Sequence, residues 1–194
     1  MSKSLDVSVH RKIRSSCQKY FKIEKLPLKG AYLIKPFIHK DKRGLFLKLF
    51  EDKILEKLGF TINEFFFSIN KKNVLRGLHY LSKPQSRLIF CLSGKVFDVI
   101  VDIRKNSKTY GKWHGLVLSD KDHTALFIPK GFAHGFLSLE KRTILLYFTD
   151  GHYNKKLERG IAWNDPQLNI KWPLKKLPII SNRDMRFPLM KDLV

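Results

Sequence analysis

Cysteine is nearly absent from this sequence, which has only Cys17 and Cys91 among 194 residues. The two lie in different contexts without metal-ligand spacing, which argues against a disulfide framework or a cysteine-based metal site and favours reduced thiols in a cytoplasmic protein. Apolar runs long enough to cross a bilayer are also missing, so no membrane partner is expected. The charged N-terminus lacks a continuous apolar stretch and therefore does not resemble a secretory signal.

Acidic residues are few: 17 Asp and Glu stand against 38 Lys and Arg, which gives a formal net charge of +21. Nucleic-acid binding would explain such a charge. The basic residues are scattered, however, and no zinc-finger spacing, basic helix or aromatic-interleaved recognition motif is present. We therefore expect no nucleic-acid partner. The same positive field would steer a small anionic substrate, such as a sugar nucleotide, toward the protein.

The length and the hydrophobic content of 43%, including 15 Phe, fit one globular domain with a full core. Residues 1–21 are basic and weakly patterned, and we expect them to form an arm or a short helix. Residues 22–194 are expected to form the domain itself.

Short apolar segments with Gly, Pro, Asn or Lys at the breaks dominate this domain. They predict an all-β antiparallel sandwich or barrel. One internal helix is expected over Glu51–Phe60, where Ile54, Leu55 and Leu58 share a face. The expected strands lie within residues 30–37, 44–50, 64–69, 74–81, 86–94, 95–104, 111–118, 124–129, 133–139 and 142–149.

The strand "KVFDVIVDI" indicates what the barrel encloses. Phe97, Val99, Val101 and Ile103 alternate onto one face, which leaves Asp98 and Asp102 on the other. Buried carboxylates need donors such as Arg or His. One face of the sheet is therefore expected to line a polar cavity that holds a ligand.

After Thr149 the sequence becomes loop-like and carries Pro166, Pro173, Pro178 and Pro188. Such a tail is not a second domain. We expect it to wrap back over the barrel and to carry functional groups on its loops.

The candidate chemistry narrows to histidine acid–base catalysis. A strand-borne metal site usually has a His-x-His pair, but the residue two positions after His79 is Leu81. His134 is well placed for a further ligand, yet the pair is missing, so no bound metal is expected. Neither a nucleophile elbow nor a glycine-rich phosphate loop is present. His79, His134 and Tyr147 suit proton abstraction beside a carbonyl. Taken singly, each such residue is more often a packed core residue.

Five motifs that occur together and in order favour a catalytic role over a packed core role for these residues. They are "VLRGLHY", "GKVFDVIVDIRKNSKTYGKWHGLVLS", "FIPKGFAHGFLSL", "RGIAWNDPQLNIKWP" and "PIISNRD". Together, from about Ile23 to Asp184, they closely resemble the dTDP-4-dehydrorhamnose 3,5-epimerase family. The resemblance implies a cupin-like jelly-roll barrel without metal or other cofactor. It also implies a homodimer that exchanges N-terminal strands. The implied substrate is a nucleotide-linked 4-keto-6-deoxyhexose, in a deoxysugar pathway for a cell-surface polysaccharide or another glycosylated product.

The resemblance also implies catalytic roles. His79 in "GLHY" matches the base that removes a proton beside the C4 ketone, and Asp184 in "SNRD" matches the carboxylate that pairs with it. Tyr147 matches the residue that returns a proton on the other face. Arg87 stands where the family usually has a Lys near the developing enolate, and either cation would stabilise that charge.

Further matches concern substrate binding. Arg76 corresponds to an Arg near the phosphates, although strict alternation puts it on the face opposite His79; a bulge at Gly77 would reconcile the two. The remaining binding residues implied by the resemblance are His134 and Asp98 in the pocket, Tyr153 after the tyrosine strand, and Arg43 and Phe46 in the nucleotide motif D-x-R-G-x-F-x-E, which is presented to the partner subunit.

Departures from the family pattern leave alternatives open. Lys48 replaces the Glu that closes the nucleotide motif, Leu81 replaces a Gln, and the family's Tyr-Tyr is His152 and Tyr153. A carboxylate accepts from N3–H of thymine, whereas an ammonium group donates to cytosine, so a CDP-linked sugar is one alternative. An epimerase of C3 or C5 alone, including one acting on a 3,6-dideoxy sugar, is another. The rivals are a ketoisomerase and a non-catalytic sugar-nucleotide-binding protein.

Overall fold

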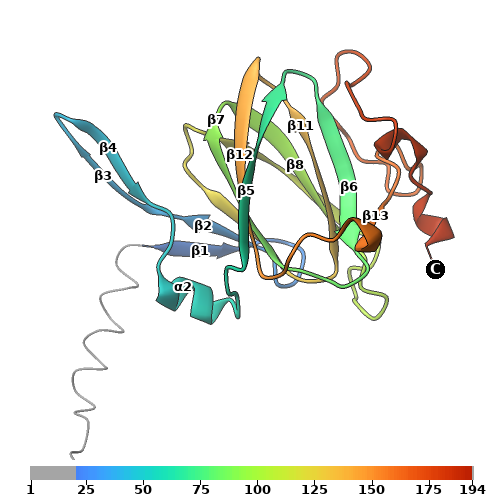
Figure 1. Cartoon of the computed structure of the whole chain (residues 1–194), viewed down its shortest axis with the longest axis horizontal. Coiled ribbons are helices and arrows are strands. Elements are labelled where there is room, and N and C mark those ends of the chain that lie inside the picture. The colour runs from blue at the N-terminus through green and yellow to red at the C-terminus, as the bar shows by residue number, and fades with distance from the viewer. Residues whose placement is uncertain (1–20, 194) are drawn as a thin grey trace, which may run out of the picture.

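The computed structural model describes residues 21–193, which form a β-rich barrel with a few short helices (Figure 1). In chain order the elements are β1 (Lys22–Lys25), β2 (Tyr32–Lys35), β3 (Phe37–Asp41), β4 (Gly44–Lys48), α2 (Asp52–Lys57), β5 (Glu64–Lys71), β6 (Leu75–Leu81), β7 (Arg87–Ser93), β8 (Lys95–Asp102), β9 (Trp113–Ser119), β10 (Ala125–Ile128), β11 (Phe132–Ser138), β12 (Arg142–Thr149), η1 (Lys155–Leu157), β13 (Glu158–Gly160), η2 (Asp184–Arg186) and η3 (Met190–Asp192).

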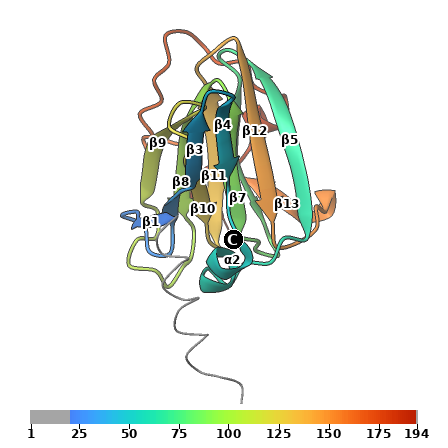
Figure 2. The same cartoon turned by 90° about the vertical axis from the view of Figure 1, so that its left-hand side faces the viewer.

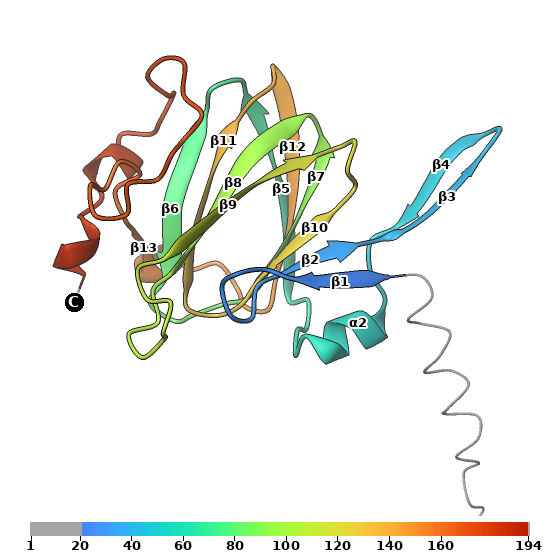
Figure 3. The same cartoon turned by 180° about the vertical axis from the view of Figure 1, so that it is seen from behind.

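Two sheets face each other across the core, as Figures 1 and 3 show from opposite sides. The first has the strand order β1-β2-β10-β7-β12-β5, and the second has the order β13-β6-β11-β8-β9. Side chains from both sheets meet between them, for example Ile89 and Leu145 from the first and Ile100 and Phe136 from the second. This architecture confirms the predicted all-β, cupin-like jelly roll.

The C-terminal tail covers the outer face of the second sheet. Val99 and Val101 of β8 pack there against Ile161, Leu168 and Met190 of the tail. The alternation predicted for β8 is thus observed, with its apolar side buried under the tail. The tail is irregular as predicted, apart from β13 and the short helices η1 to η3, and it lies beside β6 in Figure 1.

The predicted helix at residues 51–60 is present but shorter, because α2 ends at Lys57 and the chain then turns through Gly59 at φ +60°. Ile54 and Leu55 are its buried residues and pack with Phe127 against the outer side of the first sheet. The sequence did not predict β1 or β13. Each is short and charged, and β1 is defined by its pairing with β2 rather than by an apolar pattern of its own.

Strands β3 and β4 form a hairpin that projects away from the barrel (Figures 1 and 3), and Figure 2 shows it in front of the barrel strands. Pro36 lies between β2 and β3 and divides the predicted strand at residues 30–37. The predicted arm at residues 1–21 lies outside the described residues except for Phe21, which is buried. None of the helices found in residues 21–193 has the length and apolar character needed to span a bilayer.

Candidate active site

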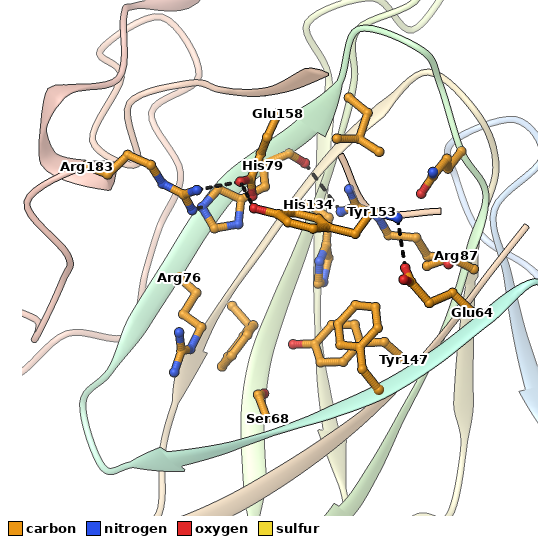
Figure 4. Close-up of a pocket in the computed structure, with 15 residues that line it drawn as sticks. Glu64, Ser68, Arg76, His79, Arg87, His134, Tyr147, Tyr153, Glu158 and Arg183 are labelled. Atoms are coloured by element: carbon orange, nitrogen blue, oxygen red, sulfur yellow. Dashed lines mark hydrogen bonds and ion pairs between the residues drawn. The ribbon is translucent and has the colours of Figure 1, made fainter. Parts of the chain in front are cut away.

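A cavity of about 260 Å³ opens between the two sheets, and side chains from both of them line it (Figure 4). His79 comes from β6 and His134 from β11 of one sheet, whereas Arg87 of β7 and Tyr147 of β12 come from the other. The remaining lining residues are Glu64, Phe66, Ser68, Arg76, Leu81, Gln85, Phe136, Thr149, Tyr153, Glu158 and Arg183.

His79 and Asp184 form a hydrogen-bonded pair although they lie far apart in sequence. Nε2 of His79 is 2.9 Å from Oδ2 of Asp184, and the same oxygen accepts the backbone N–H of Gly77 at 3.0 Å. Burial alone would raise the pKa of Asp184, but the hydrogen bonds from His79, Gly77 and Ser181 and the charge of His79 hold it well below its usual range. Asp184 is therefore a carboxylate at neutral pH.

The ionised carboxylate fixes the tautomer of His79. A carboxylate only accepts hydrogen bonds, so Nε2 of His79 carries the hydrogen that it donates to Asp184. The lone pair is then on Nδ1. The ring of Phe187 meets the His79 ring edge to face at a centroid distance of 5.6 Å. This arrangement suits a general base.

A bulge at Gly77 brings Arg76 and His79 into the same cavity. On β11, His134 pairs with His79 and Phe136 with Arg76, so three steps along β6 oppose two along β11. Gly77 has φ +118°, and a Cβ at this position would lie 2.6 Å from Cα of Gly135. The predicted bulge is confirmed, and it explains why two residues of odd spacing both line the cavity.

Tyr147 lines the wall opposite His79, as Figure 4 shows. Its ring stacks on Phe66 with centroids 4.9 Å apart, and 8% of the residue is exposed. Burial raises the pKa of Tyr147, an effect that a hydrogen bond with Ser68 and the charge of Arg87 only partly offset. The phenol therefore stays protonated at neutral pH and has a proton to give.

Other polar residues surround His79 and Tyr147. Arg87 is half-buried and donates from Nη1 to the carbonyl oxygen of His79 at 3.4 Å; desolvation lowers the pKa of its guanidinium. Nε2 of His134 lies 2.9 Å from both carboxylate oxygens of Asp98. Asp98 is fully buried and contacts His134, but it does not itself line the cavity. Nε of Arg76 donates to Oδ1 of Asn70 at 2.8 Å. Within residues 21–193, no three His, Cys, Asp or Glu side chains gather as a metal site.

Three predicted substrate-binding residues lie away from this cavity, on the β3–β4 hairpin or at its end. Arg43 pairs with Asp41 at 2.6 Å, and Nζ of Lys48 lies 3.6 Å from Glu51. Phe46 is 60% exposed. The single chain therefore does not bring the hairpin residues together with His79 and Tyr147.

Sequence reasoning missed Glu158 and Arg183, which both line the cavity. Nη2 of Arg183 lies 3.3 Å from Nε2 of His79, and the Arg183 guanidinium forms an ion pair with Glu158. The hydroxyl of Tyr153 donates to Glu158 at 3.0 Å. The available signal was the position of Arg183 directly before Asp184. Glu158 gave none, because β13 was not predicted.

Comparisons with known proteins agree with this geometry. A family model described as dTDP-4-dehydrorhamnose 3,5-epimerase matches residues 25–192. The dTDP-4-dehydrorhamnose 3,5-epimerase of Methanothermobacter thermautotrophicus is 40% identical over 180 residues, which cover 89% of this chain and 96% of that protein.

Solved structures give the same result. A dTDP-6-deoxy-D-glucose-3,5-epimerase from Legionella pneumophila, in complex with dTDP-4-keto-L-rhamnose, matches with a TM-score of 0.87 at 38% identity, over 90% of this chain and 95% of that chain. A 3'-monoepimerase from Streptomyces bikiniensis, in complex with dTDP-quinovose, has a TM-score of 0.82 at 30% identity over 87% of each chain. These matches span the cavity residues and most of the sequence, and the chain therefore belongs to the dTDP-4-dehydrorhamnose 3,5-epimerase family.

Proposed function

We propose that this protein epimerises a dTDP-linked 4-keto-6-deoxyhexose at C3 and C5. The observation that carries the proposal is the position of a hydrogen-bonded histidine and a protonated tyrosine on opposite walls of one cavity. Inversion at carbon requires a proton to leave on one face and another to arrive on the opposite face. Two groups that face each other across one cavity meet this requirement.

The proposed reaction uses only proton transfers. The C4 ketone acidifies the neighbouring C–H bonds, and Nδ1 of His79 takes one proton while the electron pair moves to the ketone oxygen. Asp184 stabilises the imidazolium, and Arg87 stabilises the enolate. Tyr147 then protonates the carbon from the other wall as the ketone re-forms. Solvent takes the proton from His79 and restores the one on Tyr147, so the sugar is isomerised without a redox step.

Binding of the substrate is proposed to use further residues of this cavity and, at the nucleotide end, residues of the β3–β4 hairpin. Arg76 is proposed to contact the phosphates, and His134, held by Asp98, and Tyr153 to line the sugar pocket. Arg43, Phe46 and Lys48 are proposed to contact the nucleotide in the cavity of a second subunit, because the projecting hairpin carries them away from their own cavity.

A homodimer is therefore part of the proposal. The edge strand β5 leaves Phe65, Phe67 and Ile69 more than half exposed on its outer face. An apolar row of this kind is typical of a surface that another subunit covers. Light scattering coupled to size exclusion is expected to give twice the chain mass, and a monomer that is fully active would contradict the proposal.

The nucleotide is proposed to be dTDP, with CDP as the alternative suggested by Lys48. In the single chain Nζ of Lys48 is 3.6 Å from Glu51, so a carboxylate is present beside the ammonium group. The Lys48→Glu variant separates the two readings. If Lys48 selects cytosine, this variant shifts preference from CDP toward dTDP sugars, whereas an unchanged preference removes Lys48 from nucleotide recognition.

Proton exchange in D2O, followed by NMR, tests the reaction directly. With dTDP-4-keto-6-deoxyglucose we expect deuterium at both C3 and C5 and the appearance of the inverted sugar. Deuterium at one carbon would make the protein an epimerase of C3 or C5 alone. A preference for the CDP sugar would change the nucleotide. No exchange with either sugar in a folded protein would leave the non-catalytic sugar-nucleotide-binding protein as the better reading.

The proposed compartment is the cytoplasm, which the two isolated cysteines and the nucleotide-linked substrate support. Recovery of the chain in a membrane or secreted fraction would contradict this assignment.

A further inference from the structure

A guanidinium group touches both members of the His79–Asp184 pair. Nε of Arg183 donates to Oδ1 of Asp184 at 3.2 Å, and Nη2 of Arg183 lies 3.3 Å from Nε2 of His79. Since Nε2 donates its hydrogen to Asp184, the 3.3 Å approach is a contact between a cation and the imidazole rather than a hydrogen bond to its lone pair. Two side-chain donors thus converge on one carboxylate, beside the backbone N–H of Gly77, and one of the two is permanently charged.

Glu158 balances that charge. Its Oε2 pairs with Nη1 of Arg183 and also accepts the hydroxyl of Tyr153. The Glu158 side chain is 14% exposed, against 48% for Arg183, so the carboxylate is the more fixed partner. Its position comes from β13, where Glu158 pairs with Leu81 and Gly160 pairs with His79. Figure 4 shows Glu158 and Arg183 side by side with His79 at the edge of the cavity.

We propose that Arg183 and Glu158 are positioning residues that set how readily His79 holds a second proton during the reaction. The inference rests on the proposed function, in which His79 is the base. When His79 becomes an imidazolium, it lies against the guanidinium of Arg183, and this repulsion opposes protonation. Glu158 offsets the repulsion by neutralising Arg183 from the other side. The protonated site is then an array of two cations and two carboxylates.

Other charged or titratable groups also face His79. Arg76 lies on the same strand, Arg87 approaches from β7 and His134 is opposite on β11. Tyr147 of β12 and Tyr153 of the following loop complete this surrounding. None of them touches the Asp184 carboxylate, whereas Arg183 does. Substitution of Arg183 or Glu158 therefore changes the charge at the pair and leaves Arg76, Arg87, His134 and Tyr147 in place. Tyr153 hydrogen-bonds Glu158, and in Glu158→Gln the amide oxygen can still accept its hydroxyl.

The two single substitutions are expected to act in opposite directions. Arg183→Gln removes the repelling cation and leaves the Glu158 carboxylate, so the midpoint of His79 protonation moves to higher pH. Glu158→Gln leaves the Arg183 charge unbalanced, so the midpoint moves to lower pH. Each shift is expected to be roughly 0.5–1 pH unit, the smaller for Glu158 because it lies behind Arg183. The double variant is expected to return toward the wild-type midpoint.

The measurement is an NMR pH titration of the histidine rings in the full, substrate-free protein. The His79 signal is assigned as the one of the 7 histidines that disappears in His79→Asn. Arg186→Gln is the matched control, because Arg186 is an exposed arginine on the same short helix as Asp184. It is expected to leave the midpoint unchanged. The acid limb of kcat/KM is expected to follow the NMR midpoint in each active variant.

Two results would overturn the inference. In the first, Arg183→Gln and Glu158→Gln both give the same His79 midpoint as the control Arg186→Gln. In the second, both variants shift the His79 midpoint in the same direction. The NMR titration needs no turnover. If the coupling is found but no sugar exchanges deuterium, the proposed function fails and the charge coupling stands. If the sugar is epimerised but the midpoints do not move, the inference fails and the function stands.

Discussion

The His79→Asn variant is expected to lose epimerisation and deuterium exchange while keeping its fold. Asparagine has no group that takes a proton from carbon near neutral pH, so removing the proposed base should lower kcat by about 10³-fold. Asn retains an N–H donor for Asp184, whose carboxylate is otherwise left without its closest partner. His79→Ala should lose activity equally but adds a small cavity. The readouts are NMR exchange at C3 and C5 and the thermal unfolding midpoint.

His123→Asn is the matched control for this variant. His123 lies in the turn between β9 and β10, outside the cavity lining, and adopts φ +51°, which asparagine accepts readily. It should keep full activity and an unchanged unfolding midpoint. Turnover near the wild-type rate in a well-folded His79→Asn protein would remove His79 as the base and return it to the role of a core histidine with a partner.

Local pattern predicted part of the site, and the family resemblance supplied the rest. The alternation of β8 placed Asp98 inside the barrel, and the odd spacing of Arg76 and His79 required a bulge that Gly77 supplies. Asp102 shares the face of Asp98 but differs in role, because it lies at the end of the strand. It accepts hydrogen bonds from Arg104, Ser107 and Thr109 and so anchors the following loop. Alternation alone does not distinguish a strand's middle from its end.

Long-range contacts account for what the sequence did not predict. Glu158 reaches the cavity only because β13 adds to the edge of β6, and three residues of mixed character carry no strand signal. Arg183 reaches His79 because the tail folds back over the second sheet. The hairpin carrying Arg43 and Phe46 shows the reverse case: its motif was recognised in the sequence, but the hairpin projects away from the cavity of its own chain.

The Tyr147→Phe variant is expected to separate the two halves of the reaction. The stacking on Phe66 survives, because only the hydroxyl is lost, and the buried site should fold normally. Without the buried phenol, protonation from the second wall should fall by about 10²–10³-fold. His79 still removes a proton and still returns one, but to the face from which it came. Deuterium should therefore enter the substrate with retained configuration, while formation of the inverted sugar nearly stops.

Tyr110→Phe is the control for this separation, since Tyr110 lies in the loop between β8 and β9, outside the cavity lining. Exchange and inversion should both remain at wild-type rates in it. In Tyr147→Phe, unchanged inversion would mean that another group protonates the carbon. An equal loss of exchange and inversion would mean that Tyr147 takes part in deprotonation as well. If base and acid occupied one wall, every proton would return to the face that lost it. Deuterium exchange that continues in Tyr147→Phe while inversion is lost is therefore expected only if base and acid occupy opposite walls.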